Sequence, residues 1–180
     1  MPKYPAESAS PTDDALVRAY AGGDVTAFET LYARYEARVF GFCLRYLGDR
    51  DAAADAFQET FMRLVDGAVA YEPRGRFPSW IFTIARRVCI DILRTDKKQR
   101  PVGDAGDIPA ISGPAAADIE RRDELERYLS RLPPEQREVL LLHQYHGFAY
   151  EEVAAMTGST AAAVKQRAYR ALKTLRAAVT

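Results

Sequence analysis

The sequence predicts an all-α protein made of two small helical domains joined by a flexible linker. Three observations support this fold class. Apolar residues recur at spacings of three and four along most of the chain, as one face of a helix requires. No segment of useful length alternates apolar and polar residues in the manner of a strand. A stretch rich in Gly and Pro interrupts the helical pattern after about residue 95, so the 180 residues divide into two parts.

The first domain is expected over residues 12–95, after a disordered tail over residues 1–11 that contains three prolines. Thr12 is suited to cap a short helix over residues 13–21, because its hydroxyl can accept a bond from a free backbone N–H. Two glycines end this helix, and Asp24 or Thr26 can cap the next. The apolar stripe of that longer amphipathic helix is formed by Phe28, Leu31, Tyr32, Tyr35, Val39, Phe42, Cys43 and Tyr46.

Two further helices complete the first domain. The earlier one is expected over residues 51–65. Its apolar side carries Phe57, Phe61, Leu64 and Val65. A loop rich in Gly and Pro follows over residues 67–78. The later helix has Pro78 in its first turn, where no backbone N–H is needed, and is expected to end near Arg94.

The second domain is expected over residues 118–180, after a flexible linker over residues 96–117 that is rich in Gly, Pro and small polar residues. Its first helix is ended by Pro133-Pro134, which also start the next helix. Two more helices are expected over residues 150–156 and 160–178.

Composition and residue content exclude several classes of protein. No apolar run is long enough to span a membrane, and the N-terminus lacks the apolar region of a signal peptide. Cys43 and Cys89 have apolar neighbours, which predicts buried, reduced thiols in a cytoplasmic protein. His143 and His146 lack suitably placed partners for zinc. We expect no metal, no cofactor, no catalytic residues and no membrane insertion.

The charges are segregated along the chain, although the net charge is zero. Residues 74–100 carry eight basic and two acidic side chains, a net +6, and residues 49–72 carry two basic and six acidic ones, a net −4. Residues 151–180 carry five basic and two acidic side chains, a net +3. Basic faces attract phosphate, although a run of charge is often only a solvated surface. The neutral total is also compatible with a closed free state in which acidic and basic faces meet.

The strongest motif is a helix-turn-helix over residues 150–167. Ala154 is small enough to let the second helix cross closely, and Gly158 permits the left-handed turn between the helices. Val164 is placed to fill the core between the helices beside Val153. An ordinary helical hairpin is the alternative interpretation of this pattern.

In a helix-turn-helix the start of the second helix enters the major groove of DNA. Lys, Arg and Gln side chains can hydrogen-bond to base edges there, and Thr and Ala methyl groups can contact the thymine methyl. The DNA-facing positions are expected to be Thr160, Ala162, Lys165, Gln166, Arg167, Tyr169 and Arg170.

Three features of the first domain stand together. They are the acidic amphipathic helix over residues 55–64, the basic loop over residues 71–76, and the helix Phe77–Arg94. With these features the chain closely resembles the extracytoplasmic-function group of the bacterial sigma-70 family. The resemblance covers about residues 12–95 and 120–178.

The resemblance implies that this chain binds RNA polymerase core and reads promoter DNA without chemistry of its own. The helix over residues 55–64 would dock on a coiled coil of the largest polymerase subunit. The implied contact residues are Asp55, Phe57, Gln58, Glu59 and Phe61. Alternatively, the two phenylalanines face their own core. The family also implies an anti-sigma partner that masks such surfaces.

The resemblance also assigns the two promoter elements. The second domain would read the −35 element through its helix-turn-helix. The helix after Pro78, with the loop before it, would face the −10 element, where a base is held outside the stack and single-stranded DNA follows basic and aromatic side chains. The implied −10 residues are Arg74, Arg76, Trp80, Arg86, Arg87 and Arg94. Trp80 is equally suited to be a core anchor.

The chain departs from the family pattern at several positions. Arg87 stands where the family often has Asn, so the mode of base capture is open. Thr157, Ser159 and Thr160 replace a common Leu, an apolar residue and a frequent Pro around the turn, which predicts looser packing. The alternative function is a stand-alone helix-turn-helix regulator that binds duplex DNA without polymerase.

Overall fold

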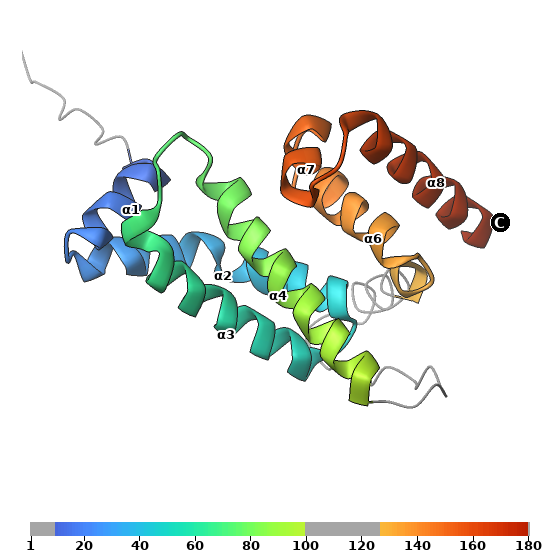
Figure 1. Ribbon diagram of the computed structural model, residues 1–180, viewed down its shortest axis with the longest axis horizontal. Helices are drawn as coiled ribbons and strands as arrows, with labels where there is room; N and C mark the ends of the chain where they lie inside the picture. The colour runs from blue at the N-terminus through green and yellow to red at the C-terminus, as the bar shows by residue number, and fades with distance from the viewer. Residues whose placement is uncertain (1–9, 100–126, 180) are drawn as a thin grey trace, which may run out of the picture.

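The structure is a computed structural model that describes residues 10–99 and 127–179. Every regular element in this part of the chain is a helix, as the sequence predicts (Figure 1). The first unit contains α1 (Asp13–Ala21), α2 (Val25–Leu47), α3 (Arg50–Gly67) and α4 (Phe77–Gln99). The second contains α6 (Pro134–Leu140), α7 (Tyr150–Thr157) and α8 (Ala161–Val179). None of the described helices is long and apolar enough to cross a membrane.

The helix starts follow the capping residues seen in the sequence. The Thr12 hydroxyl accepts a hydrogen bond from the Ala15 N–H at 3.3 Å, which satisfies a free donor of α1. Asp24, not Thr26, caps α2 through a bond from the Thr26 N–H at 3.0 Å. Gly48 then ends α2 with φ +72°, a left-handed conformation that glycine adopts without steric cost.

The α4 helix extends past the predicted end at Arg94 and reaches Gln99. Residues 95–99 contain no Gly or Pro, and the first residue that disfavours a helix is Pro101, which acts on the residue before it. The predicted linker over residues 96–117 therefore begins inside α4. Its remainder lies outside the described residues, as do residues 1–9 of the predicted tail and residues 118–126 of the second domain.

A π-helical turn, η2 (Leu141–Tyr145), continues α6 in the second unit. This wider turn leads to Gly147, which has φ +77° shortly before α7. Leu141 and Leu142 remain buried within the π turn. The widened backbone thus keeps the apolar side of this segment in the core while the chain reverses toward α7.

The cores of the two units are continuous. Phe42 and Phe82 are fully buried between α2 and α4, with ring centroids 5.6 Å apart. Phe82 also meets Phe148 of the second unit at 5.5 Å. Figure 1 shows the second unit beside α4, and α2 also reaches it, since Arg137 of α6 donates to the Tyr46 carbonyl. Both α2 and α4 therefore support the core of their own unit and the packing of the second unit.

The two cysteines lie in the core of the first unit. Cys43 on α2 and Cys89 on α4 are free and fully buried, as predicted. A hydrogen bond with Cys43, together with burial, raises the pKa of the Cys89 thiol. The Cys89 thiol is therefore held in its neutral form.

Candidate nucleic-acid and protein interfaces

The aromatic residues of α3 form part of a cluster that joins α3 to α2. The Phe57 ring lies 5.9 Å from that of Tyr32 and 6.0 Å from that of Phe40, and the Phe61 ring lies 4.9 Å from that of Tyr32. Phe61 retains 6% of its surface, whereas Phe57 is half-buried. Phe61 is thus mainly a core residue, and Phe57 divides its surface between core and solvent.

A groove of about 550 Å³ runs along this α2–α3 face. Its lining residues are Phe28, Tyr32, Ala54, Phe57, Gln58, Phe61, Met62, Val65 and Asp66. Met62 is 56% exposed and Val65 is 37% exposed, so these two side chains offer apolar surface to a partner. The sequence placed Val65 on the packed side of the helix and did not single out Met62.

Of the polar residues predicted on α3, Gln58 lines this groove, whereas Asp55 and Glu59 lie outside its lining. Asp55 and Gln58 are exposed. Glu59 is half-buried and pairs with Arg63 at 2.7 Å, one helical turn later. The groove therefore combines an apolar floor with a polar rim, which is the usual composition of a protein–protein contact.

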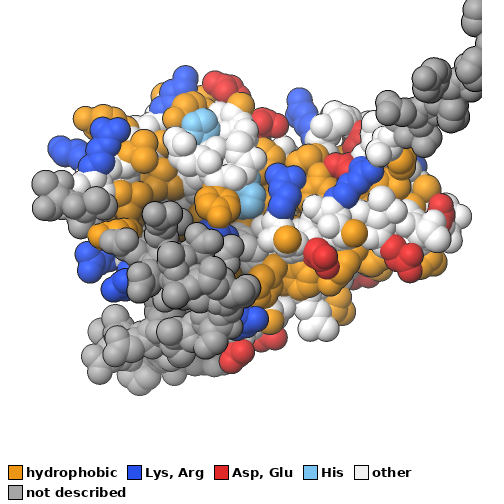
Figure 2. Space-filling model, turned by 180° about the vertical axis from the view of Figure 1, so that it is seen from behind, with side chains coloured by type: hydrophobic (Ala, Val, Ile, Leu, Met, Phe, Trp, Pro, Cys, Tyr) orange, Lys and Arg blue, Asp and Glu red, His pale blue; other side chains and the backbone are white. Residues whose placement is uncertain are grey.

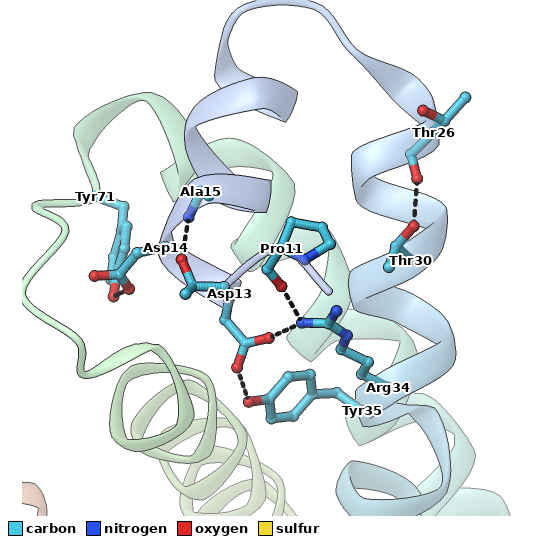
Figure 3. Close-up of polar contacts among 10 residues, drawn as sticks. Pro11, Asp13, Asp14, Ala15, Thr26, Thr30, Arg34, Tyr35 and Tyr71 are labelled. Atoms are coloured by element: carbon cyan, nitrogen blue, oxygen red, sulfur yellow. Dashed lines mark hydrogen bonds and ion pairs between the residues drawn. The ribbon is translucent and has the colours of Figure 1, made fainter. Parts of the chain in front are cut away.

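Two acidic residues at the start of α1 hold the first unit together and position its basic loop (Figure 3). Asp13 accepts hydrogen bonds from Arg34 at 2.7 Å and from the Tyr35 hydroxyl at 2.5 Å. Asp14 accepts one from the Tyr71 hydroxyl at 2.8 Å and one from the Gly75 N–H at 2.5 Å. Both acids lie in the first turn of α1, where negative charge is favourable, and both also form tertiary contacts.

The loop positioned by Asp14 carries the predicted cations Arg74 and Arg76, and both are exposed. Burial, reinforced by the hydrogen bond to Asp14, raises the pKa of the Tyr71 hydroxyl, which therefore remains a donor that secures the loop. Arg74 pairs with Glu72 in the same loop. This geometry presents the two guanidinium groups on a fixed backbone.

Trp80 links the basic loop to α4. Its ring lies 4.6 Å from the Tyr71 ring and 5.8 Å from the Phe77 ring. A Cβ atom at Gly67 would lie 3.1 Å from the Trp80 ring, closer than ordinary van der Waals contact, so a larger residue there would require the ring to shift. Trp80 is half-buried and also lines a cavity that contains Arg87. Trp80 therefore anchors the core on one side and faces a cavity on the other.

Arg86 is engaged within the chain. Its guanidinium forms an ion pair with Glu138 of α6, and the two side chains are only 17% and 7% exposed. The predicted role of Arg86 as a phosphate ligand stays a prediction, and it would require this pair to open. Arg87 and Arg94 are both exposed on α4.

The helix-turn-helix has the geometry that its spacing predicted. Gly158 has φ +65° at the turn, and Val153 and Val164 are fully buried. The Thr160 hydroxyl accepts a bond from the Ala163 N–H at 3.2 Å and so caps α8. The polar substitutions at the turn are satisfied locally, because Thr157 donates to the Val153 carbonyl at 2.8 Å.

The outward face of α8 is open. The exposed members of the predicted DNA-facing set are Thr160, Ala162, Lys165, Gln166, Tyr169 and Arg170. Tyr169 is 68% exposed, which is unusual for a large aromatic side chain. Arg167 is half-buried, and its guanidinium bonds to the Ser159 hydroxyl at 3.1 Å and approaches Glu135 at 3.5 Å.

The two units also contact each other through polar groups. Arg137 of α6 donates to the Tyr46 carbonyl at the end of α2 at 2.8 Å. Arg45 of α2 donates to the Tyr145 hydroxyl at 2.7 Å, and its guanidinium lies 4.2 Å from that ring. Ser79 of α4 donates to Glu152 of α7 at 3.3 Å. Each of these contacts joins residues far apart in the sequence.

His146 lies at the junction of the units. Its ring is 4.3 Å from the Phe82 ring and 5.8 Å from the Phe42 ring, and its Nε2 atom is buried without a hydrogen-bond partner. Burial, together with the nearby Arg38 and Arg45, lowers the pKa of His146 to about 4. Figure 2 shows both histidines as pale blue spheres among hydrophobic side chains. His146 is a neutral packing residue of the junction.

Comparison with known families assigns both units. Residues 31–99 match the family described as Sigma-70 region 2, and residues 122–175 match Sigma-70, region 4. These ranges contain α3, α4 and the helix-turn-helix.

Several sigma factors are similar to this chain over most of its length. RNA polymerase sigma factor CarQ of Myxococcus xanthus is 33% identical over 87% of this chain and 91% of its own. ECF RNA polymerase sigma factor EcfG of Rhodopseudomonas palustris is 34% identical over 76% of both chains. ECF RNA polymerase sigma factor SigK of Mycobacterium tuberculosis is 32% identical over 91% of both.

Solved structures share the fold. CnrH, in complex with the cytosolic domain of CnrY, has a TM-score of 0.73 and 24% identity, and the match covers 93% of this chain and 96% of that one. RpoE of Bartonella quintana, in complex with the anti-sigma factor NepR, has a TM-score of 0.69 and 24% identity over 84% and 96%. On the evidence of its relatives and of both matched regions, the chain belongs to the extracytoplasmic-function group of the sigma-70 family of RNA polymerase sigma factors.

Proposed function

We propose that this sigma factor uses three separate surfaces: the α3 groove for RNA polymerase core, the basic surface of α4 and its preceding loop for the −10 element, and the outward face of α8 for the −35 element. The chain would act in the cytoplasm and supply no covalent chemistry, which polymerase provides. The observation that carries this proposal is the chemical difference between the three surfaces, each of which suits a different partner.

The α3 groove suits a helical protein partner. Met62 and Val65 are exposed beside the half-buried Phe57, which gives an apolar strip along one side of α3. Asp55 and Asp66 are exposed near this strip and favour a partner with basic residues flanking its apolar ridge. In most protein–protein interfaces a few residues near the centre contribute most of the binding free energy. Exposed apolar side chains such as these are suited to that role.

The α4 surface suits single-stranded DNA. Arg74, Arg76 and Arg87 are exposed around Trp80, so cations lie beside an aromatic ring. Proteins that hold single strands combine such cations, which neutralise phosphates, with aromatic rings on which bases stack. Arg94 extends the cationic surface along α4.

The α8 face suits duplex DNA. Lys165, Gln166 and Arg170 are exposed on the helix that follows the left-handed turn, where a recognition helix meets base edges and phosphates. Duplex binding by this face alone would also suit a stand-alone regulator. Neither the α3 groove nor the similarity to sigma factors over both units is explained by that alternative.

A regulatory partner is also part of the proposal. Two structures that share this fold are complexes, one with the cytosolic domain of CnrY and one with the anti-sigma factor NepR. We infer that an anti-sigma protein masks the groove or the α4 surface of this chain. The exposed apolar residues Met62 and Val65 would give such a protein a point of attachment.

The polymerase contact can be tested without disturbing the core. Met62→Asp plus Val65→Asp changes only exposed side chains, whereas Phe61 is too buried to separate binding from folding. The matched control is Val25→Asp plus Val69→Asp, because these valines are 62% and 82% exposed and do not line the groove. Each protein is purified with bacterial RNA polymerase core and used in run-off transcription from a promoter library.

The groove pair should abolish co-purification and new start sites, while the control pair retains both. Equal activity in the two double variants would show that the groove is not the polymerase contact. Binding of duplex DNA by the wild type without any association with core would instead favour the stand-alone regulator.

A further inference from the structure

The first helix of the chain lies outside both matched families. The matches cover residues 31–99 and 122–175, whereas α1 spans Asp13–Ala21. None of the three proposed surfaces includes α1. Yet α1 is hydrogen-bonded directly to the basic loop over residues 71–76. This contact connects α1 to the surface proposed for the −10 element.

Asp14 makes the connection with a single carboxylate. Its Oδ1 atom accepts a hydrogen bond from the Tyr71 hydroxyl at 2.8 Å, and its Oδ2 atom accepts one from the Gly75 N–H at 2.5 Å. The Gly75 N–H belongs to the peptide that follows Arg74, so this bond fixes the backbone beside that arginine. In the described part of the chain, no other hydrogen bond joins residues 72–75 to a helix. Asp14 therefore determines where this part of the loop lies relative to the helices.

The far end of the loop is secured by α4. The Trp80 N–H donates to the Arg76 carbonyl at 3.0 Å, and the Trp80 ring lies 4.6 Å from the Tyr71 ring. Tyr71, Arg74, Arg76 and Trp80 all line the same cavity. The loop is thus held at both ends, and the end that carries Arg74 depends on α1.

We propose that Asp14 is a positioning residue for −10 recognition: it holds the backbone of the basic loop so that Arg74 and Arg76 lie where a promoter strand meets them. This inference rests on the proposed −10 role of that surface. Asp14 is half-buried and negatively charged, so it is not suited to bind phosphate itself. The contact groups of a selective site must be held within about 0.5 Å of the productive geometry, and neighbouring hydrogen bonds supply that constraint.

Asp13 provides a matched control for Asp14. It lies in the same turn of α1 and also accepts two hydrogen bonds, from Arg34 at 2.7 Å and from the Tyr35 hydroxyl at 2.5 Å. Figure 3 shows the Asp13 carboxylate pointing toward α2 and the Asp14 carboxylate pointing toward Tyr71. Asp13→Ala therefore removes the same charge as Asp14→Ala but leaves the loop contacts in place. A purely structural role would make the two variants behave alike.

The test uses run-off transcription by RNA polymerase core with the full-length wild type, Asp14→Ala or Asp13→Ala. The template is the strongest promoter of the library, with its −10 and −35 elements changed one base at a time. The discrimination at each element is the ratio of transcription from the original promoter to that from the changed ones. Asp14→Ala should lower the −10 discrimination about fivefold and leave the −35 discrimination unchanged. Asp13→Ala should preserve both ratios.

Two conservative variants sharpen the test. Asp14→Asn keeps an oxygen that can accept from the Gly75 N–H, so it should retain more −10 discrimination than Asp14→Ala. Tyr71→Phe removes one of the two bonds but keeps the ring against Trp80, and should lower the −10 discrimination about twofold. If Asp14→Ala does not fold, Tyr71→Phe decides the question, and an unchanged −10 discrimination in that variant would overturn the proposal.

The outcomes also separate this proposal from the proposed function. Equal −10 discrimination in Asp14→Ala and Asp13→Ala would show that Asp14 has no positioning role. Arg74→Ala plus Arg76→Ala tests the surface itself. If this pair lowers the −10 discrimination while the two aspartate variants behave alike, the surface stands and the positioning role is wrong. If this pair leaves the −10 discrimination unchanged, the proposed −10 surface is wrong.

Discussion

The two surfaces proposed to meet DNA differ in how the rest of the chain treats them. On α8, Lys165 and Tyr169 are exposed, and Tyr169 retains 68% of its surface. On α4, the Arg86 side chain retains 17% and is paired with a buried Glu138, while Arg87 faces acidic residues across a cavity. Both surfaces are rich in cations. Whether a cationic surface is free to bind DNA therefore depends on its neighbours in the folded chain, which the local sequence does not contain.

The contrast also assigns different energetic roles to the two surfaces. The covered side is part of a continuous core, because Phe82 packs against Phe42 of its own unit and Phe148 of the other. The outward face of α8 contributes little to the free energy of unfolding, because its side chains are exposed. Substitutions on the junction side of α4 should therefore change stability, and those on the outward face of α8 should change DNA binding alone.

The largest effect is expected from Phe82→Ala. Phe82 is fully buried at the junction, so its loss leaves a cavity that both units line, and we expect the free energy of unfolding to fall by about 3–5 kcal/mol. Guanidinium denaturation measures this loss. Phe57→Ala is the control, since that side chain is only partly buried beside the α3 groove, and its cost should be about 2 kcal/mol or less. Equal losses would contradict the junction as a shared core.

The buried ion pair should give the next largest effect. Glu138→Gln leaves the Arg86 guanidinium with no countercharge in a site where the two side chains are 17% and 7% exposed, which should cost about 3 kcal/mol. Replacing both partners with apolar residues, Arg86→Met plus Glu138→Leu, should recover most of that loss in denaturation experiments.

The exposed pair Arg63–Glu59 provides the comparison for that experiment. Its side chains are 42% and 43% exposed, so Arg63→Met should cost less than about 0.5 kcal/mol. Similar costs for Glu138→Gln and Arg63→Met would show that the junction pair is solvated, and so would argue against a closed state in solution.

Acid should loosen the junction through His146. Its pKa is lowered to about 4 in the folded chain, against an ordinary 6.5, so the folded form disfavours the protonated ring. The neutral ring makes its full contribution to the free energy of unfolding above about pH 6.5. This contribution is lost as the pH falls toward 4, and about 2 kcal/mol is lost by pH 5. The unfolding free energy of the wild type and of His146→Gln, measured from pH 7 to 5, isolates this contribution.

The carboxylates titrate in both of those proteins, so the difference between the two curves is the informative quantity. The wild type should lose stability relative to His146→Gln as the pH falls. Parallel curves would mean that His146 is accessible to water and that the junction does not bury it.

The smallest effect on stability is expected at the open surface. Tyr169→Ala removes a side chain that is 68% exposed, so the unfolding free energy should change by less than about 0.5 kcal/mol. Binding to duplex promoter DNA by the holoenzyme should weaken severalfold, as measured by mobility shift. Gln144→Ala, an uncharged and exposed change in η2, serves as control. A large loss of stability in Tyr169→Ala would erase the contrast between the two surfaces.

Local sequence features predicted many of the helices and their ends. Thr12 and Asp24 cap α1 and α2 because each side-chain oxygen reaches a free N–H two or three residues ahead. Gly158 turns between α7 and α8 because a positive φ is cheap only for glycine. The predicted end of α4 at Arg94 was too early. The helix continues to Gln99, because the first residue that disfavours a helix is Pro101.

The candidate surfaces were predicted less completely. The residues on α8 followed from the motif, since the turn fixes which face of the helix points outward. On α3 the sequence singled out Phe61, which is 6% exposed, and missed Met62, which is 56% exposed. Periodicity shows which residues share a face, but the aromatic cluster with Tyr32 decides how deeply each one is buried.

The all-α fold, the capping residues, the helix-turn-helix and the segregation of charge could be predicted from the sequence alone, because each depends on residues within a few positions of one another. The contacts of Asp14 with the basic loop and of Glu138 with Arg86 could not, because they form only when distant helices pack together. The partners in those contacts are 61 and 52 residues apart, and neither spacing nor composition brings them together. The packing of whole helices does so, and it determines which cations remain free to meet DNA.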